Sequence, residues 1–140
     1  FLKNYLELNQ DHLPMGLCLS RMNDFSKAVF RGGFVDLSRD IFKYIVKKNV
    51  KDIQEDALFF YLWTYLLKND FKDALKVAEK HNLTKDLSLI TDPRLKFWIA
   101  YALENTGQLK EAISFYENTV DSSPLSYYAI MSVKKLHALK

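Results

Sequence analysis

The stretch that decides the fold runs from Asp92 to Pro124 and reads DPRLKFWIAYALENTGQLKEAISFYENTVDSSP. Apolar residues recur in each half at the spacing of one helix face, and the sequence NTGQ separates the two halves. Asp92 and Pro93 suit the start of the first helix, and Gly107 suits its end because glycine accepts positive φ. The stretch therefore predicts two antiparallel helices joined by a tight turn. The two apolar faces consist of Leu95, Trp98, Ile99, Ala102 and Leu103, and of Leu109, Ala112, Ile113, Tyr116 and Val120.

The composition of the 140-residue chain favours an all-α fold. Hydrophobic residues make up 49% and aromatic residues 14%, which is enough for a packed core, and only 4 Gly and 3 Pro interrupt the helical patterns. The formal net charge of +3 is too small to indicate a nucleic-acid partner unless the basic residues cluster. The pairs Lys47-Lys48 and Lys134-Lys135 are short, and we expect them to be solvated helix surface. No apolar run approaches the roughly 18 residues that a membrane-spanning helix needs, so no membrane span is predicted.

Two further features concern the context of the chain. Cys18 is the only cysteine, so an intrachain disulfide is impossible, and its apolar neighbours predict a small buried residue. The chain begins with Phe1 rather than Met, and we interpret it as a processed or excised part of a larger protein.

Helix pairs recur along the chain. Similar short sequences begin at Phe34, Phe71 and Leu109, and their starts are 37 and 38 positions apart (71 − 34 = 37; 109 − 71 = 38). A regular spacing of this size is typical of stacked helix pairs, in which each pair buries one face on the next. We therefore expect a single domain over residues 1–140, with a further short helix within residues 1–10. The expected hairpins cover approximately 15–48, 53–82 and 94–121, and a final helix covers 125–139.

The last pair also matches the tetratricopeptide motif, whose period is about 34 residues. With Pro93 as the first position, Ala100 and Ala112 fall where the motif has small residues at close helix crossings. Tyr116 falls where an aromatic side chain fills the neighbouring gap, whereas Lys96 stands where the motif prefers Trp. The predicted fold is thus all-α, a right-handed superhelix of stacked antiparallel hairpins of the TPR-like α-solenoid type.

No catalytic or metal-binding constellation occurs in the sequence. His12, His81 and His137 lie far apart in the sequence, and no paired cysteines or zinc-protease motif accompany them. The pair Gly32-Gly33 is interpreted as a turn rather than as a phosphate-binding loop. We therefore expect these 140 residues to have no catalytic residue, no cofactor and no metal site.

One set of residues has a binding interpretation. In stacked helix pairs the first helix of each pair lines the concave side, and here aromatic residues on those helices alternate with hydrogen-bonding groups. Such a face suits an extended peptide or a glycan strand. The alternative is that these aromatic residues pack against the next helical layer. The candidate binding residues are Asp56, Phe59, Trp63, Arg94, Phe97, Tyr101, Glu104 and Asn105.

Three segments resemble a known family. The sequences ALFFYLW at 57–63, RLKFWIAYALE at 94–104 and SPLSYYAIM at 123–131 are, in this order, similar to the superhelical region of soluble lytic murein transglycosylases. Ala129 stands where that family has Gly. The family's catalytic Glu lies in a Glu-Ser element of a separate lysozyme-like domain, and no Glu-Ser pair occurs here. The resemblance therefore implies a non-catalytic scaffold.

This resemblance has consequences for partners and location. It implies a bacterial, periplasmic protein that helps to position peptidoglycan strands for the catalytic domain of a parent transglycosylase. The alternative function is a freestanding TPR-type adaptor that binds a peptide or protein segment. The same repeats underlie both interpretations.

Overall fold

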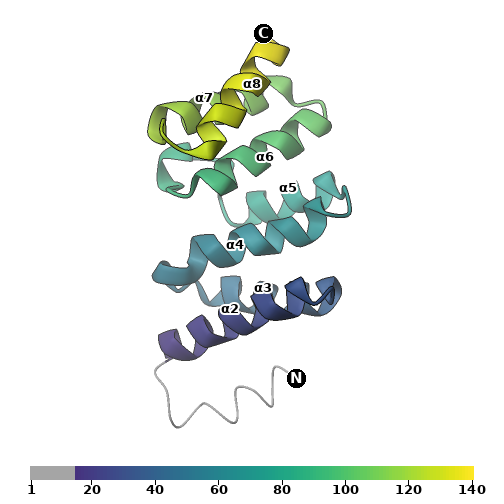
Figure 1. Cartoon of the computed structure of the whole chain (residues 1–140). Helices are drawn as coiled ribbons and strands as arrows, with labels where there is room; N and C mark the ends of the chain where they lie inside the picture. Colours follow the sequence, from purple (N-terminus) through teal and green to yellow (C-terminus); the bar gives the residue numbers. More distant parts are fainter. Residues whose placement is uncertain (1–14) are drawn as a thin grey trace. The chain divides into compact units, whose positions relative to one another are not determined.

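The structure is a computed structural model that describes residues 15–140, and every regular element in this range is helical (Figure 1). The all-α prediction is therefore confirmed, whereas the short helix expected within residues 1–10 lies outside the described residues. Contacts divide the chain into two compact units, of which unit 1 ends at Thr64 and unit 2 begins at Tyr65.

Unit 1 contains α2 (Met15–Arg31), α3 (Val35–Lys48) and most of α4 (Lys51–Leu66). α2 packs against α3. α4 joins them through Phe60, whose ring stacks on Phe42 with centroids 5.6 Å apart and meets Phe30 edge to face. The apolar side chains buried between α2, α3 and α4 therefore hold this unit together. Its buried apolar residues are Cys18, Leu19, Met22, Ile41, Phe42, Ile45, Val46, Ala57, Leu58, Phe59, Tyr61 and Leu62, which confirms the prediction for Cys18.

Unit 2 contains α5 (Phe71–Lys80), the 3-10 helix η1 (Leu87–Leu89), α6 (Pro93–Asn105), α7 (Leu109–Ser122) and α8 (Tyr127–Leu139). α6 is its central helix, because α6 packs against α5, α7 and α8, and α8 in turn packs against α7 (Figure 1). The largest apolar side chains in the core of unit 2 are Leu66, Leu75, Leu83, Ile90, Leu95, Phe97, Ile99, Leu103, Phe115 and Tyr116.

The sequence features that predicted the α6–α7 pair act as expected. The side chain of Asp92 accepts a hydrogen bond from the amide of Arg94 at 2.9 Å, and Pro93 is the first residue of α6. Gly107 has a φ of 84°, and the turn directly follows α6. Ala100, Ala112 and Tyr116 are all fully buried, so the predicted contact between α6 and α7 is confirmed. Gly32 and Gly33 likewise form the predicted turn, between α2 and α3.

The turns that follow α2, α4 and α6 have the same backbone conformation. Each contains a residue of positive φ whose amide donates to the carbonyl three residues earlier, and the next amide donates to the carbonyl five residues earlier. These bonds satisfy carbonyl groups that the end of a helix leaves without partners. In these three turns the residues of positive φ are Gly33 (91°), Asn69 (58°) and Gly107 (84°). The longer-range bonds join Phe34 to Val29 (3.2 Å), Asp70 to Tyr65 (3.1 Å) and Gln108 to Leu103 (2.9 Å).

This shared turn corrects the register of the predicted repeats. The sequence comparison placed Phe34 level with Phe71 and Leu109, but Phe34 precedes α3 whereas the other two residues begin their helices, so Val35 is their equivalent. The sequences were misaligned by one position because the residue that caps α3 is aromatic, whereas the residues that cap α5 and α7 are polar. The residues that cap α3, α5 and α7 are Phe34, Asp70 and Gln108, with φ of −86°, −83° and −87° and ψ of 64°, 63° and 68°.

In the corrected register, a small buried residue lies four positions after the residue that caps α3, α5 or α7. Its amide donates to the carbonyl of the capping residue, which starts the helix, and its small side chain permits close approach of a neighbouring helix. Four positions further on, a second residue is fully buried in every pair. The small residues are Ser38, Ala74 and Ala112, and the second set is Phe42, Ala78 and Tyr116.

The turn conformation predicts opposite effects for two substitutions. Gly107→Ala should lower the free energy of unfolding by about 1–2 kcal/mol, because an L-residue is strained at positive φ. Asn69→Gly should instead raise it, by less than about 1 kcal/mol, because it removes that strain from the equivalent position. Urea unfolding followed by far-ultraviolet circular dichroism measures both changes. A destabilised Asn69→Gly chain together with an unaffected Gly107→Ala chain would contradict the shared left-handed turn.

Candidate peptide-binding surfaces

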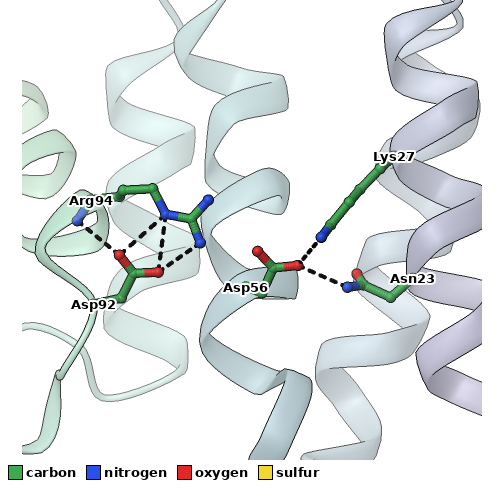
Figure 2. A network of polar contacts seen from close by, with 5 residues as sticks. All are labelled: Asn23, Lys27, Asp56, Asp92 and Arg94. Carbon is green, nitrogen blue, oxygen red and sulfur yellow. Dashed lines mark hydrogen bonds and ion pairs between the residues drawn. The ribbon is translucent and has the colours of Figure 1, made fainter. Parts of the chain in front are cut away.

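In unit 1, a carboxylate of α4 binds two side chains of α2 (Figure 2). Asp56 Oδ2 accepts a hydrogen bond from Asn23 Nδ2 at 2.9 Å and forms an ion pair with Lys27 Nζ. The same ammonium group lies over the ring of Phe60, 5.2 Å from its centroid. The side chains of Lys27 and Asp56 are partly exposed, so water screens their attraction. The cluster ties α2 to α4 and leaves its charges within reach of solvent.

Asn23 contributes an unsatisfied acceptor to this cluster. Its side chain is buried and its Nδ2 is committed to Asp56, yet its Oδ1 has no hydrogen-bond partner. An acceptor left unpaired in this way costs about 1–3 kcal/mol of stability.

Two aromatic residues of α4, Phe59 and Trp63, lie one and two turns further along the helix. The rings of Phe59 and Trp63 stack with centroids 5.8 Å apart and an interplanar angle of 24°. Phe59 is buried and also meets Phe60 edge to face, whereas Trp63 is half-buried. Phe59 therefore supports Trp63 from within unit 1, and the indole ring reaches the surface.

In unit 2, a carboxylate of α6 is held by side chains from α7 and α8. The hydroxyl of Tyr116 donates to Glu104 Oε2 at 2.7 Å, and Lys135 Nζ donates to Glu104 Oε1 at 3.3 Å. The ammonium group of Lys135 also lies 4.9 Å from the centroid of the Tyr101 ring. The side chains of Glu104 and Lys135 are partly exposed. Three helices of unit 2 thus meet at one charged group.

Burial first, and then the hydrogen bond and negative charge of Glu104, strongly raise the pKa of Tyr116. A phenol in this environment keeps its proton because ionisation would place a second negative charge beside the carboxylate. Tyr116 is therefore a permanent donor that orients Glu104.

The Tyr101 ring beside this charged group belongs to a set of contacting aromatic rings in unit 2. Tyr101 is half-buried and meets Trp98 and Phe71 edge to face, with centroids 5.4 Å and 5.7 Å away. Phe97 is buried and contacts Trp98 and Tyr128. Trp98, Tyr101 and Tyr128 are half-buried, so they combine apolar contact area with partial access to solvent.

The two remaining candidates of unit 2 lie at opposite ends of α6. The guanidinium of Arg94 binds both carboxylate oxygens of Asp92, with Nη2 2.8 Å from Oδ2 and Nε 3.2 Å from Oδ1 (Figure 2). Asn105 is exposed and donates from Nδ2 to the carbonyl of Tyr101 at 2.8 Å. Arg94 therefore presents a guanidinium whose orientation is fixed by the residue that caps α6.

The structure thus distributes the eight candidates over two units, and it adds residues that the sequence analysis missed. Asp56, Phe59 and Trp63 lie in unit 1, and the other five lie in unit 2. Lys135 was expected to be solvated surface, which is wrong, because it is half-buried between a ring and a carboxylate. The repeat period could have identified Lys135. It follows the candidate residue Tyr101 by 34 positions (135 − 101 = 34), about one tetratricopeptide repeat, and so occupies the equivalent position on the next first helix. The missed residues are Asn23, Lys27, Tyr116 and Lys135.

Residues 15–140 contain neither a metal-binding cluster nor a helix that could span a membrane. No group of three or more His, Cys, Asp or Glu residues in this range is placed to hold a metal ion. No helix of the same range combines the length and apolar character needed to cross a bilayer.

Solved structures similar to this chain support the fold. A crystal structure of PcrH from Pseudomonas aeruginosa superposes with a TM-score of 0.71 at 16% sequence identity, covering 91% of this chain and 94% of PcrH. PcrH in complex with the chaperone binding region of PopB superposes with a TM-score of 0.67 at 16% identity, covering 92% of this chain and 98% of that one. No protein-family model and no curated protein matches the sequence. The predicted class, all-α with TPR-like helix pairs, is confirmed.

These comparisons correct the expectations that came from the family resemblance. The predicted periplasmic location is wrong, because it depended on the transglycosylase resemblance and the similar structures are PcrH, which points away from it. They also give no support to peptidoglycan as a ligand or to a transglycosylase parent. The segments that carried the resemblance are rich in aromatic and apolar residues, and such residues form the core of helix pairs whatever their function.

The Tyr116–Glu104 contact predicts a loss of stability at alkaline pH. Tyr116→Phe should lower the free energy of unfolding by about 1 kcal/mol at neutral pH, since a partly exposed carboxylate loses a donor. In the wild type, Tyr116 ionises near pH 10 only when the chain unfolds, so its contribution is complete below pH 10 and falls as the pH rises further.

The measurement is urea unfolding between pH 8 and pH 11, compared for the wild type, Tyr116→Phe and a control. The difference in stability between wild type and Tyr116→Phe should shrink as the pH passes 10, the ordinary tyrosine value. Tyr127→Phe, which removes an exposed hydroxyl from the same unit, should follow the wild type. A difference that stays constant over this range would show that Tyr116 is not held neutral.

Proposed function

We propose that this chain binds an extended segment of a partner protein on the first helices of its helix pairs. The observation that carries the proposal is a feature found in both units: a lysine joins two such helices through a ring and a carboxylate. In unit 1, Lys27 of α2 reaches Phe60 and Asp56 of α4. In unit 2, Lys135 of α8 reaches Tyr101 and Glu104 of α6.

Each of these surfaces supplies the groups that a peptide needs. The half-buried rings of Trp63 and Tyr101 offer flat apolar area for side chains at little cost in conformational entropy. The exposed amide of Asn105 can donate to a peptide carbonyl. The partly exposed ion pairs can exchange contacts with polar groups of the ligand because they are not sealed in the core.

The eight candidate residues have different parts in this proposal. Trp63 and Tyr101 contact the ligand, Asp56, Arg94, Glu104 and Asn105 supply its polar contacts, and Phe59 and Phe97 support the surface from the core. This division follows the burial of the two phenylalanines, which also agrees with the alternative that these rings pack internally. Such support is a positioning role.

The likeness to PcrH favours a protein ligand. The PcrH complex shows that a chain of this fold accommodates a segment of another protein, the chaperone binding region of PopB. At 16% identity the likeness establishes the fold, and the binding residues must be sought in this chain itself. This supports an adaptor or chaperone role above a scaffold for glycan strands.

The proposal is tested with peptides selected from a phage-displayed random library on the immobilised 140-residue chain. Affinities of the selected peptides are measured by isothermal titration calorimetry with the wild type, Trp63→Ala and Tyr101→Ala. We expect at least one of these variants to weaken binding about tenfold or more, which corresponds to about 1.4 kcal/mol. Leu89→Ala, at an exposed apolar residue of η1, is the matched control and should bind as the wild type does.

Two outcomes would count against this function. One is a selection that yields only peptides indifferent to both ring substitutions while circular dichroism shows the variants folded. The other is co-sedimentation of the chain with purified peptidoglycan sacculi that is lost in Trp63→Ala or Tyr101→Ala, which would assign these rings to glycan.

A further inference from the structure

The outer face of α8 in unit 2 carries a row of exposed apolar residues. Tyr127 is 66% exposed, Ile130 58% and Val133 41%, and Leu125, two residues before the helix begins, is 99% exposed. Within α8, Tyr127, Ile130 and Val133 follow one another at three-residue spacing, so they share one side of the helix. Such a contiguous apolar row on the surface is typical of an interaction site.

The internal repeat shows what this face corresponds to. α6 and α8 are both 13 residues long, and each is capped by the side chain of an extended residue, Asp92 and Ser126, that accepts a hydrogen bond from a backbone amide. The two caps are 34 positions apart (126 − 92 = 34), one tetratricopeptide period. Leu95 of α6 and its equivalent Ala129 of α8 are both buried. α8 therefore has the length, cap and buried position of a first helix, as α6 does.

α6 and α8 differ on another face, the one that α7 covers in α6. Lys96 of α6 is buried there and donates from Nζ to Ser122 Oγ of α7 at 2.9 Å, and its neighbours on this face are buried as well. The corresponding residues of α8 are exposed. A second helix thus covers the first in the α6–α7 pair, whereas within residues 65–140 the matching face of α8 is open. The equivalent residues are Lys96 and Ile130, Ile99 and Val133, and Leu103 and His137.

A hollow marks the C-terminal end of this face. It has a volume of about 290 Å³ and lies between α7 and α8, where it is lined by Val120, Val133, Leu136, His137 and Lys140. Its apolar walls suit a large apolar side chain of an incoming helix, with basic groups at the rim.

Charge identifies the chemistry of the occupant. No acidic residue occurs from Ser122 to Lys140. Lys135 is paired with Glu104 and Lys140 with Glu117, so Lys134 and His137 are the basic groups of the outer face of α8. Lys134 stands at the position of Ala100, where α6 and α7 cross. A helix that docks on α8 therefore meets a cation at the crossing and needs a carboxylate there.

We propose that the outer face of α8, formed by Tyr127, Ile130 and Val133, docks an acidic amphipathic helix of a partner protein in the manner in which α7 covers α6. A second copy of this chain fits less well, because two α8 helices packed together would bring basic residues against one another. This inference is independent of the peptide-binding surfaces proposed above.

The probe is a peptide with the sequence of α7, Leu109–Ser122, in which Ala112→Glu places a carboxylate opposite Lys134. The α7 sequence has one Lys and three acidic residues, a net charge of −2 (1 − 3 = −2), and the substitution makes it −3 (−2 − 1 = −3). Binding of the fluorescein-labelled peptide to the full chain is followed by fluorescence anisotropy. A second peptide with Ala112→Lys differs only in the charge at the crossing. We expect saturable binding of the Glu peptide and at least about tenfold weaker binding of the Lys peptide.

Variants of the chain locate the binding on α8. Ile130→Asp and Val133→Asp should each weaken the Glu peptide by about tenfold or more, and both residues are exposed, so the fold should survive. Leu89→Asp introduces the same charge at an exposed apolar residue of η1 and should leave binding unchanged.

Three results would overturn the inference: no binding of the Glu peptide, equal binding of both peptides, or binding indifferent to both α8 variants. A concentration-dependent dimer in sedimentation equilibrium that Ile130→Asp abolishes would assign this face to a second copy of the chain instead.

Discussion

A residue of positive φ, followed by an amide that bonds to the carbonyl five residues earlier, sets the register after α2, α4 and α6. The turn ends one helix and caps the next within a few residues, so few alternative alignments remain. It brings a small residue into a fully buried position four residues after each cap, at Ser38, Ala74 and Ala112. Because the turn is local in sequence, each of the three turns obtains its conformation from its own residues, and this suits a fold built from repeats.

That register places charged and aromatic residues at regular positions on the first helices. Lys27 and Lys135 each bring one ammonium group to a ring and a carboxylate of a neighbouring helix. Such a contact combines cation–π and ionic attraction, and its partial exposure limits what it adds to stability. What it does is hold aromatic side chains at the surface in fixed positions. Rings that are ordered in this way lose little entropy when a ligand binds, which supports the proposed binding of a peptide.

Local features of the sequence predicted much of this fold. Asp92 and Gly107 identified the ends of α6, and the spacing of Ala100, Ala112 and Tyr116 identified its contact with α7. The register of the first pair escaped prediction because Phe34 is an apolar residue at a capping position. The partners of Asp56 and Glu104 escaped because Lys27 and Lys135 come from other helices, and nothing local distinguishes them from solvated lysines. The location was mispredicted because aromatic-rich segments recur in unrelated helical repeats.

Amide hydrogen exchange, resolved residue by residue by nuclear magnetic resonance, tests the shared turn most directly. The amides of Phe34, Asp70 and Gln108 precede or begin their helices, where most amides have no intrahelical acceptor and exchange rapidly. If each donates to the carbonyl five residues earlier, all three exchange far more slowly than the amides of Lys72 and Lys110, the exposed second residues of α5 and α7. Exchange of the three amides at the rates of an unfolded chain would contradict the account.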